Sequence, residues 1–151
     1  MPSALNVPKM MNKSKNPAEI SSAALAYLGD SVIEIRVREF LVSCGLSHAA
    51  DLNAAALDFV RASAQSDAVE NILPILTEGE AAAFRRGRNI GHTNTPKSAT
   101  ALQYRRATGM EALFGYLRLT GQEERADELF SFAYADIMKK YKGDQNVKSE
   151  D

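Results

Sequence analysis

The chain has 151 residues, the length of one ordinary domain with its own hydrophobic core. Its 18 Lys and Arg residues nearly balance 19 Asp and Glu residues, so the net charge of −1 excludes a uniformly basic protein. The one cysteine, Cys44, excludes a disulfide framework and predicts a buried thiol in a reducing compartment. With no signal peptide and no apolar stretch of about 20 residues, we expect no membrane association and a cytoplasmic location, with a plastid as the alternative.

The sequence predicts an all-helical fold, because apolar residues recur at helical spacing and no segment alternates with the period of a β-strand. The expected helices span about 21–44, 51–73, 77–89, 99–119 and 123–141. We expect residues 1–16 to be flexible and residues 142–151 to form a disordered polar tail, which leaves one domain over 17–141.

Local signals support the limits of these helices. Gly45 stands where a residue in the left-handed conformation would end the first helix, and Pro74 ends the second. Thr77 and Glu80 have the spacing of a capping box at the start of the third helix. Gly121 separates the last two helices.

Asp30 is the odd residue of the first helix, because it lies in the otherwise apolar run ALAYLGDSVIE at residues 24–34. At helical spacing it shares a face with apolar residues, namely Ala23, Ala26, Ile33, Val37 and Leu41. Burying an unpaired carboxylate costs roughly several kcal/mol. We therefore expect a cation, a hydrogen-bond donor or a metal ion beside Asp30.

Glu111 is a second carboxylate with largely apolar neighbours on its helix face. Gly29 precedes Asp30, while Gly109 and Gly115 flank Glu111. A glycine inside a helix costs about 1 kcal/mol relative to alanine, so these glycines indicate that the first and fourth helices cross there. Such a crossing would bring both acids to one place, where Mg²⁺ would satisfy them. The alternative is that each acid pairs with an arginine of a neighbouring helix.

One part of the chain is strongly basic. No acidic residue occurs between Glu80 and Glu111, and we call residues 81–110 the basic segment. Its cations are Arg85, Arg86, Arg88, Lys97, Arg105 and Arg106. A solvated helix surface is the alternative to a binding site, but the complete lack of acids weakens that interpretation.

Two motifs carry a resemblance to a known family. LAYLGDSVIEI at residues 25–35 resembles the ribonuclease III signature, and GMEALFGYLRL at residues 109–119 resembles the family's second motif, in which a glutamate opens an E-A-L-x-G run. Three further segments are similar to the Mini-III branch of the family, namely FRRGRN at 84–89, TPK at 95–97 and YRRATGMEALFGYL at 104–117. The resemblance covers about residues 24–141 and implies an all-α, homodimeric, ribonuclease III-like endonuclease domain.

The resemblance also implies roles for both acids. Asp30 matches the signature aspartate and Glu111 the second-motif glutamate, which are catalytic and metal-binding in the family. The expected cofactor is Mg²⁺, with Mn²⁺ as a substitute. Two other family acids are replaced by Ala26 and Thr108, departures that the Mini-III branch shares. Two protein carboxylates are therefore expected in the metal shell, with water and phosphate completing it.

The implied function is a metal-dependent endoribonuclease that cuts double-stranded RNA, with precursor 23S ribosomal RNA as the expected substrate. It would leave 5′-phosphate and 3′-hydroxyl ends, and a ribosomal protein is a potential helper. The cations of the basic segment would contact the phosphates of an RNA duplex lying in a valley of the homodimer. Two alternatives stay open: a catalytically silent, duplex-binding or ribosome-associated protein on the same fold, and a helical dimerisation module.

Overall fold

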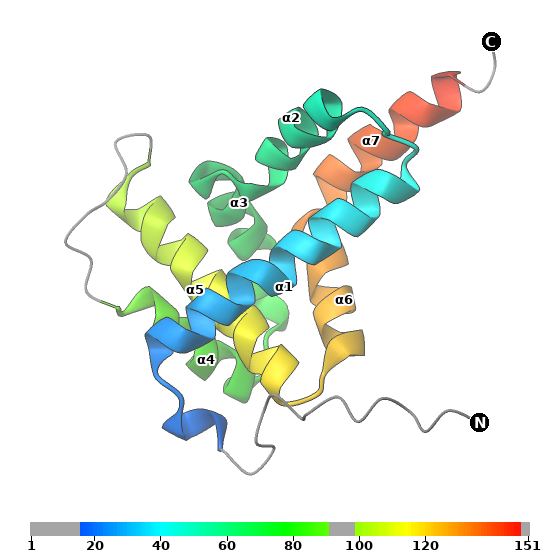
Figure 1. The fold of residues 1–151 in the computed structure, drawn as a ribbon. Helices are drawn as coiled ribbons and strands as arrows, with labels where there is room; N and C mark the ends of the chain where they lie inside the picture. Colours follow the sequence, from blue (N-terminus) through cyan, green and yellow to red (C-terminus); the bar gives the residue numbers. More distant parts are fainter. Residues whose placement is uncertain (1–15, 91–98, 149–151) are drawn as a thin grey trace, which may run out of the picture.

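The computed structural model describes residues 16–90 and 99–148, and within this part of the chain there are helices and turns but no strand, as predicted. The elements in chain order are η1 (Pro17–Glu19), α1 (Ser22–Ser43), α2 (Ala49–Val60), α3 (Ala62–Ile72), η2 (Leu73–Ile75), α4 (Glu78–Arg88), α5 (Ala101–Leu119), α6 (Glu123–Ala133) and α7 (Ala135–Lys148) (Figure 1). None of the helices in the described ranges is both long and apolar enough to cross a membrane.

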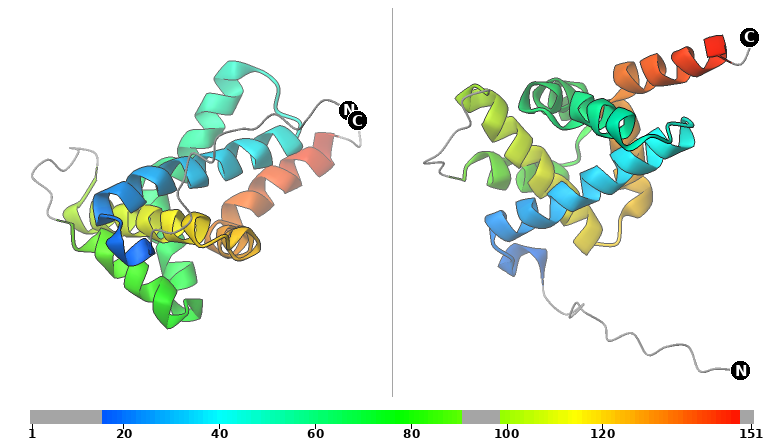
Figure 2. Two further views of the ribbon diagram at one scale, coloured as in Figure 1. Left: turned by 60° about the horizontal axis from the view of Figure 1, so that its bottom comes forward. Right: turned by 45° about the horizontal axis from the view of Figure 1, so that its top comes forward.

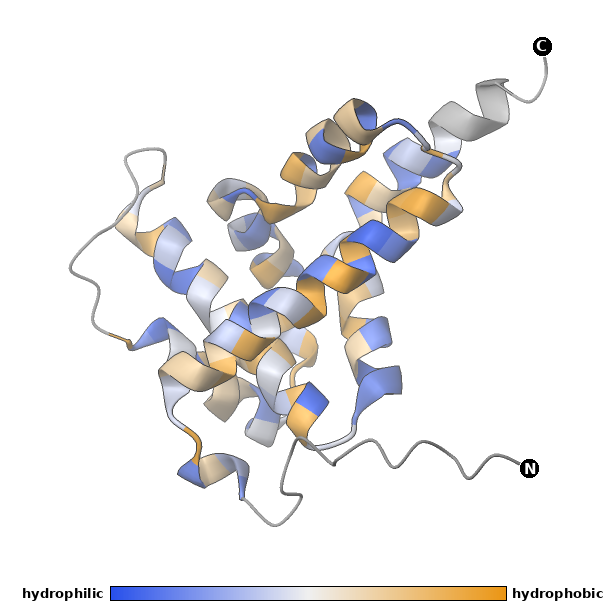
Figure 3. Cartoon of the chain, viewed as in Figure 1, coloured by the Kyte–Doolittle hydropathy of each residue, from blue (hydrophilic) through white to orange (hydrophobic). Residues whose placement is uncertain are grey.

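Helices α1 and α5 cross at the centre of the fold and share its most extensive contact (Figure 1). Helix α4 packs against α5, α3 contacts both α5 and α6, and Figure 2 shows the crossing from two further directions. Along α1 and α5, apolar and polar stretches follow one another (Figure 3), as expected of helices that bury one side and expose another. The core that these helices bury includes Phe59, Phe114 and Tyr134, and Cys44 is buried as predicted.

The predicted ends of the first helix and the predicted start of the third agree with the structure, whereas the second helix starts two residues earlier, at Ala49, and the fourth two residues later, at Ala101. The Ser21 hydroxyl caps α1 by accepting a hydrogen bond from the Ala24 backbone N–H, and Gly45 follows α1 with a φ of 86°. Thr77 and Glu80 form both hydrogen bonds of the predicted capping box. These ends depend on side chains within a few residues of the backbone that they cap.

Two predicted helices are each divided in the structure. The second is broken into α2 and α3 at Arg61, whose backbone is extended (φ −60°, ψ 143°), and the fifth into α6 and α7 at Tyr134 (φ −112°, ψ 22°). A single hydrogen bond joins the two breaks, because the buried Tyr134 hydroxyl donates to the Phe59 carbonyl at 3.0 Å. In a continuous helix that carbonyl would accept from the Ser63 N–H, so the hydroxyl satisfies a group that the break frees.

Helix α7 continues to Lys148, so residues 142–148 are helical where we predicted a disordered tail. The Tyr141 hydroxyl donates to Asp58 Oδ2 at 2.5 Å, and the Lys142 ammonium lies 5.9 Å from the centre of the Phe40 ring. These contacts hold α7 against α1 and α2, and tertiary packing of this kind extends helices of weak intrinsic stability. The predicted flexible segment lies outside the described residues except for Asn16, which caps η1.

Candidate active site at the crossing of α1 and α5

Glycines let the backbones of α1 and α5 touch. A Cβ atom at Gly29 would lie 1.5 Å from the Glu111 carbonyl oxygen, and one at Gly115 would lie 2.0 Å from the Leu25 carbonyl oxygen. No residue with a side chain fits at such distances, so this close crossing requires glycine at both positions. The predicted crossing of these two helices at Gly29 and Gly115 is therefore confirmed.

Gly109 has a different role from the one we predicted. A Cβ atom at Gly109 would lie 2.6 Å from Phe84 Cε2, and one at Gly87 would lie 2.5 Å from the Thr108 carbonyl oxygen. These two glycines bring α4 against α5. Gly109 and Gly115 are about 120° apart around the axis of α5, so each serves a different neighbouring helix.

Asp30 is exposed, so the prediction that it is buried among apolar residues is wrong. Its helix face is buried at Ala26, Ile33, Val37 and Leu41, but Ala23 is exposed like Asp30 itself. Asp30 thus lies at the edge of the buried face, a distinction that helical spacing alone does not make. Partial desolvation, and secondly the negative charge of Glu34, still raise the pKa of Asp30.

Glu111 is the acid that the fold partly buries. Burial raises the pKa of Glu111 to about 8, and the negative charge of Asp30 is the second cause. This effect of Asp30 on Glu111 puts the two carboxyl groups within electrostatic range of each other. Neither forms a hydrogen bond or an ion pair with any residue in 16–90 or 99–148, so the alternative of an arginine partner for each acid is not found there.

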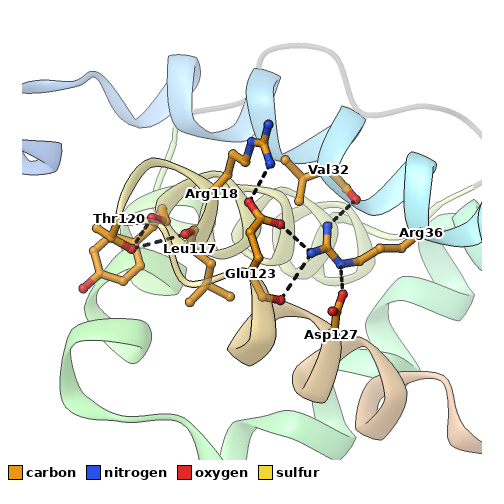
Figure 4. A network of polar contacts seen from close by, with 8 residues as sticks. Val32, Arg36, Leu117, Arg118, Thr120, Glu123 and Asp127 are labelled. Atoms are coloured by element: carbon orange, nitrogen blue, oxygen red, sulfur yellow. Dashed lines mark hydrogen bonds and ion pairs between the residues drawn. The ribbon is translucent and has the colours of Figure 1, made fainter. Parts of the chain in front are cut away.

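The nearby arginines are engaged with acids of α6 instead (Figure 4). Arg36 of α1 donates to Glu123 Oε2 at 2.8 Å and to Asp127 Oδ1 at 3.0 Å. Arg118 of α5 donates to Glu123 Oε1 at 2.7 Å. These are the first arginines after Asp30 and Glu111 on their own helices. Both arginines are paired with α6, and neither forms an ion pair with Asp30 or Glu111.

Glu80 shows what a carboxylate with a structural role looks like in this protein. It is 2% exposed, and it accepts hydrogen bonds from Arg125 Nε and Nη2, both at 2.9 Å, and from the Thr77 N–H at 2.8 Å. The Arg125 hydrogen bonds hold the pKa of Glu80 below its usual range. Glu111 has none of these partners, and its pKa moves in the opposite direction.

Asp30 and Glu111 have the right chemistry for a hard divalent cation such as Mg²⁺, which prefers oxygen ligands and keeps several waters. No group of three or more His, Cys, Asp or Glu side chains within the described ranges is arranged to hold a metal ion. Two carboxylates therefore fit a metal whose remaining ligands come from water and substrate.

The basic segment divides into outward and inward arginines. Arg85 and Arg105 are exposed, and Arg88 is half-buried with its Nε donating to Asn89 Oδ1 at 3.2 Å. Lys97 lies outside the described residues.

Arg86 and Arg106 contact the protein itself. Arg86 donates to the Pro17 carbonyl at 3.2 Å and to the Ile20 carbonyl, so it ties α4 to the chain that leads into α1. Arg106 of α5 forms an ion pair with Glu70 of α3. The structure thus gives both arginines contacts that hold helices together.

Comparisons with known proteins identify the family of this chain. Residues 23–122 match the Ribonuclease III domain family. The chain is 44% identical over 118 residues to the Mini-ribonuclease 3 of Symbiobacterium thermophilum, which covers 78% of this chain and 91% of that protein. It is 40% identical over 116 residues to the Mini-ribonuclease 3 of Enterococcus faecalis, covering 76% and 88%.

A crystal structure of a Fusobacterium nucleatum protein has the same fold. It aligns with a TM-score of 0.70 and 30% sequence identity, covering 78% of this chain and 94% of that one. The family match spans both Asp30 and Glu111. From the matched domain and the relatives together, the chain belongs to the ribonuclease III family, where it is an endoribonuclease of the Mini-ribonuclease 3 branch.

Proposed function

We propose that this endoribonuclease cleaves double-stranded RNA in a Mg²⁺-dependent reaction, and that it acts in the cytoplasm on precursor 23S ribosomal RNA. One observation carries the proposal. Asp30 and Glu111 come from different helices, lie within electrostatic range, and have no cationic partner among the described residues. The expected products carry 5′-phosphate and 3′-hydroxyl ends, and a ribosomal protein is a potential helper.

Asp30 and Glu111 would hold Mg²⁺, with Mn²⁺ as a substitute. The bound ion supplies an activated water and neutralises charge that develops on the phosphate and on the leaving 3′-oxygen. Without a cation, two ionised carboxylates at this crossing repel each other, which is one reason why the pKa of Glu111 is raised. The fold therefore brings two carboxyl groups together, and a divalent cation bound between them would favour their ionised forms.

The exposed cations of the basic segment would bind the RNA phosphates. Double-stranded RNA is recognised mainly through its shape, phosphates and 2′-hydroxyl groups, which suits arginines on a helix surface. Arg85 and Arg105 are the best placed of the described candidates, because both are exposed. Arg88 and Lys97 stay in the proposed interface, whereas the contacts of Arg86 and Arg106 with the protein favour a structural role.

The outer side of α1 supports a homodimer. Tyr27 is 85% exposed, Ile35 54% and Val42 62%, and helical spacing puts them on one side of α1. Large exposed apolar side chains gathered on one surface are typical of a protein contact. Asp30 follows Tyr27 by one turn, so a partner bound here would lie beside the proposed site. Sedimentation velocity tests this, and a purely monomeric 16.5 kDa species at every concentration would contradict it.

The catalytic proposal is tested by incubating the purified chain with a long RNA duplex, with Mg²⁺ or with EDTA, followed by gel and end-group analysis. We expect Mg²⁺-dependent cleavage that leaves 5′-phosphates. Asp30→Asn should reduce cleavage to background, because it removes a charged metal ligand, while duplex affinity stays within about two-fold. Asp67→Asn is the matched control, since Asp67 is an exposed acid of α3, a helix that carries neither proposed metal ligand.

Two outcomes would count against this assignment. Mg²⁺-dependent cutting by Asp30→Asn at the wild-type rate would refute the site. Duplex binding without any cleavage by the wild-type chain would favour the catalytically silent RNA-binding protein on the same fold.

A further inference from the structure

Glu34 lies one helical turn after Asp30 on α1. Residues four apart on a helix are neighbours on its surface, and Glu34 is half-buried at the same edge of the helix as Asp30. Glu34 Oε1 accepts a hydrogen bond from Arg38 Nη2 at 2.6 Å and from Arg38 Nε at 3.2 Å.

We propose that Glu34 is a third carboxylate for the metal ion of the proposed site, and that Arg38 holds this carboxylate until the ion binds. The inference rests on the proposed function and adds a role for Glu34, which lies inside the signature-like run at 25–35 but is not one of the two acids to which the resemblance gives a metal-binding role. Within the described residues no three His, Cys, Asp or Glu side chains are arranged to hold a metal ion, so Glu34 would have to leave Arg38 to join the site.

The direction of helical side chains favours this exchange. Each Cα–Cβ bond in a helix tilts toward the N-terminus, so the Glu34 side chain reaches back toward Asp30, as Arg38 reaches back toward Glu34. The ion pair of Glu34 with Arg38 is an exposed contact within one helix, a kind that contributes little to stability. A divalent cation beside Asp30 would therefore compete readily with the Arg38 guanidinium.

Other acids are less suitable. One helical turn before Asp30 stands Ala26, which is buried and has no side-chain atom that could bind a metal ion. Glu123 is held by two arginines, and Glu80 is held by Arg125 within the core. Glu34, by contrast, lies one helical turn from Asp30 and is held only by the exposed Arg38 side chain.

The test measures Mn²⁺ and Mg²⁺ dissociation constants by calorimetry on the full chain without RNA. We expect Glu34→Gln to weaken metal binding about ten-fold, the size of effect typical for groups that support a metal site. Glu34→Asp keeps the charge but shortens the side chain, and it should weaken binding to a similar extent. Glu39→Gln is the control, because Glu39 is an exposed acid on the opposite side of α1 from Asp30 and should leave the constant unchanged.

Arg38→Gln should change the metal affinity in the opposite direction. Freed from its partner, Glu34 should bind the ion about two-fold more tightly. The change should vanish in the Glu34→Gln background, because Arg38 acts through Glu34. A purely long-range charge effect would persist there.

Several results would overturn the inference. One such result is wild-type metal affinity in Glu34→Gln. Another is weak metal binding by Glu34→Gln together with wild-type affinity in Glu34→Asp, because that combination would show that only the net charge matters. If Asp30→Asn abolishes metal binding and Glu34→Gln does not, only this inference fails. If the wild-type chain binds neither ion, the proposed metal site fails with it.

Discussion

Glu111 is the carboxyl group whose ionised form the fold disfavours most. Its folded pKa of about 8 lies above the ordinary value of 4.5, so the native protein binds this proton more tightly than the unfolded chain does. As the pH rises from 4.5 through 8, Glu111 ionises in the unfolded chain while the native protein still holds the proton. The free energy of unfolding therefore falls over this range. Below the unfolded pKa both states carry the proton and the effect disappears.

Glu111→Gln should remove this pH dependence in metal-free buffer. The unfolding free energy of the variant should match the wild type near pH 5 and exceed it by about 1–3 kcal/mol near pH 9, with solvent screening reducing the full effect of the shift. Urea unfolding in EDTA across this range measures it. Added Mg²⁺ at pH 9 should stabilise the wild type alone. Parallel stability curves for the two proteins would contradict the assigned ionisation.

Adjacent arginines of the basic segment have different surroundings. Successive helical residues point about 100° apart, so a pair of neighbours on a packed helix places one side chain outward and the other inward. Arg85 and Arg105 are exposed, whereas Arg86 and Arg106 contact other helices. The sequence identified the basic segment correctly, but the orientation of each arginine depends on which side of its helix is covered.

Two double variants distinguish the exposed arginines from those that contact other helices. The pair Arg85→Gln and Arg105→Gln should weaken duplex RNA binding and reduce the slope of log affinity against log salt by up to about 2, because two phosphate contacts are lost. The matched pair Arg86→Gln and Arg106→Gln should lower the melting temperature and keep the salt slope. Equal slopes for the two double variants would remove Arg85 and Arg105 from the proposed interface.

At the scale of the helices, the breaks at Arg61 and Tyr134 show why some helix boundaries have no signal in the sequence. Neither Arg61 nor Tyr134 is a glycine or a proline, and the residues around each have helical spacing. The breaks are linked by the Tyr134 hydroxyl and the Phe59 carbonyl, which meet only when α6 and α2 pack together. The capping box of Thr77 and Glu80, by contrast, acts on its own helix and was predicted correctly.

The crossing of α1 and α5 should not tolerate a side chain at Gly29. Gly29→Ala should lower the unfolding free energy by more than about 3 kcal/mol, because its Cβ would overlap the Glu111 carbonyl oxygen and separate the two helices. Gly143→Ala in α7 is the control, with nothing within 4 Å of the added Cβ, and should gain up to about 1 kcal/mol. Urea unfolding compares the two, and wild-type stability of Gly29→Ala would refute the close crossing.

For the whole molecule, the neighbouring helices fix the two helices that carry the acids. Helix α4 packs on α5 through Gly87, α6 is tied to α1 through Arg36, and α3 is tied to α5 through Arg106. The outer side of α1, with Tyr27, stays exposed in the single chain. The side of the crossing that is free of these contacts is the side that we propose for the partner and the RNA.

The sequence by itself determined the helical class, the capping box of Thr77 and Glu80, and two of the glycines at which α1 and α5 cross, Gly29 and Gly115. These features depend on local spacing or on a residue type that only one backbone environment requires. The tertiary structure decided that Asp30 is exposed, that α6 takes Arg36 and Arg118, that two arginines of the basic segment point inward, and that two helices break. Each of these depends on contacts between residues far apart in the chain, and those contacts exist only once the helices have packed.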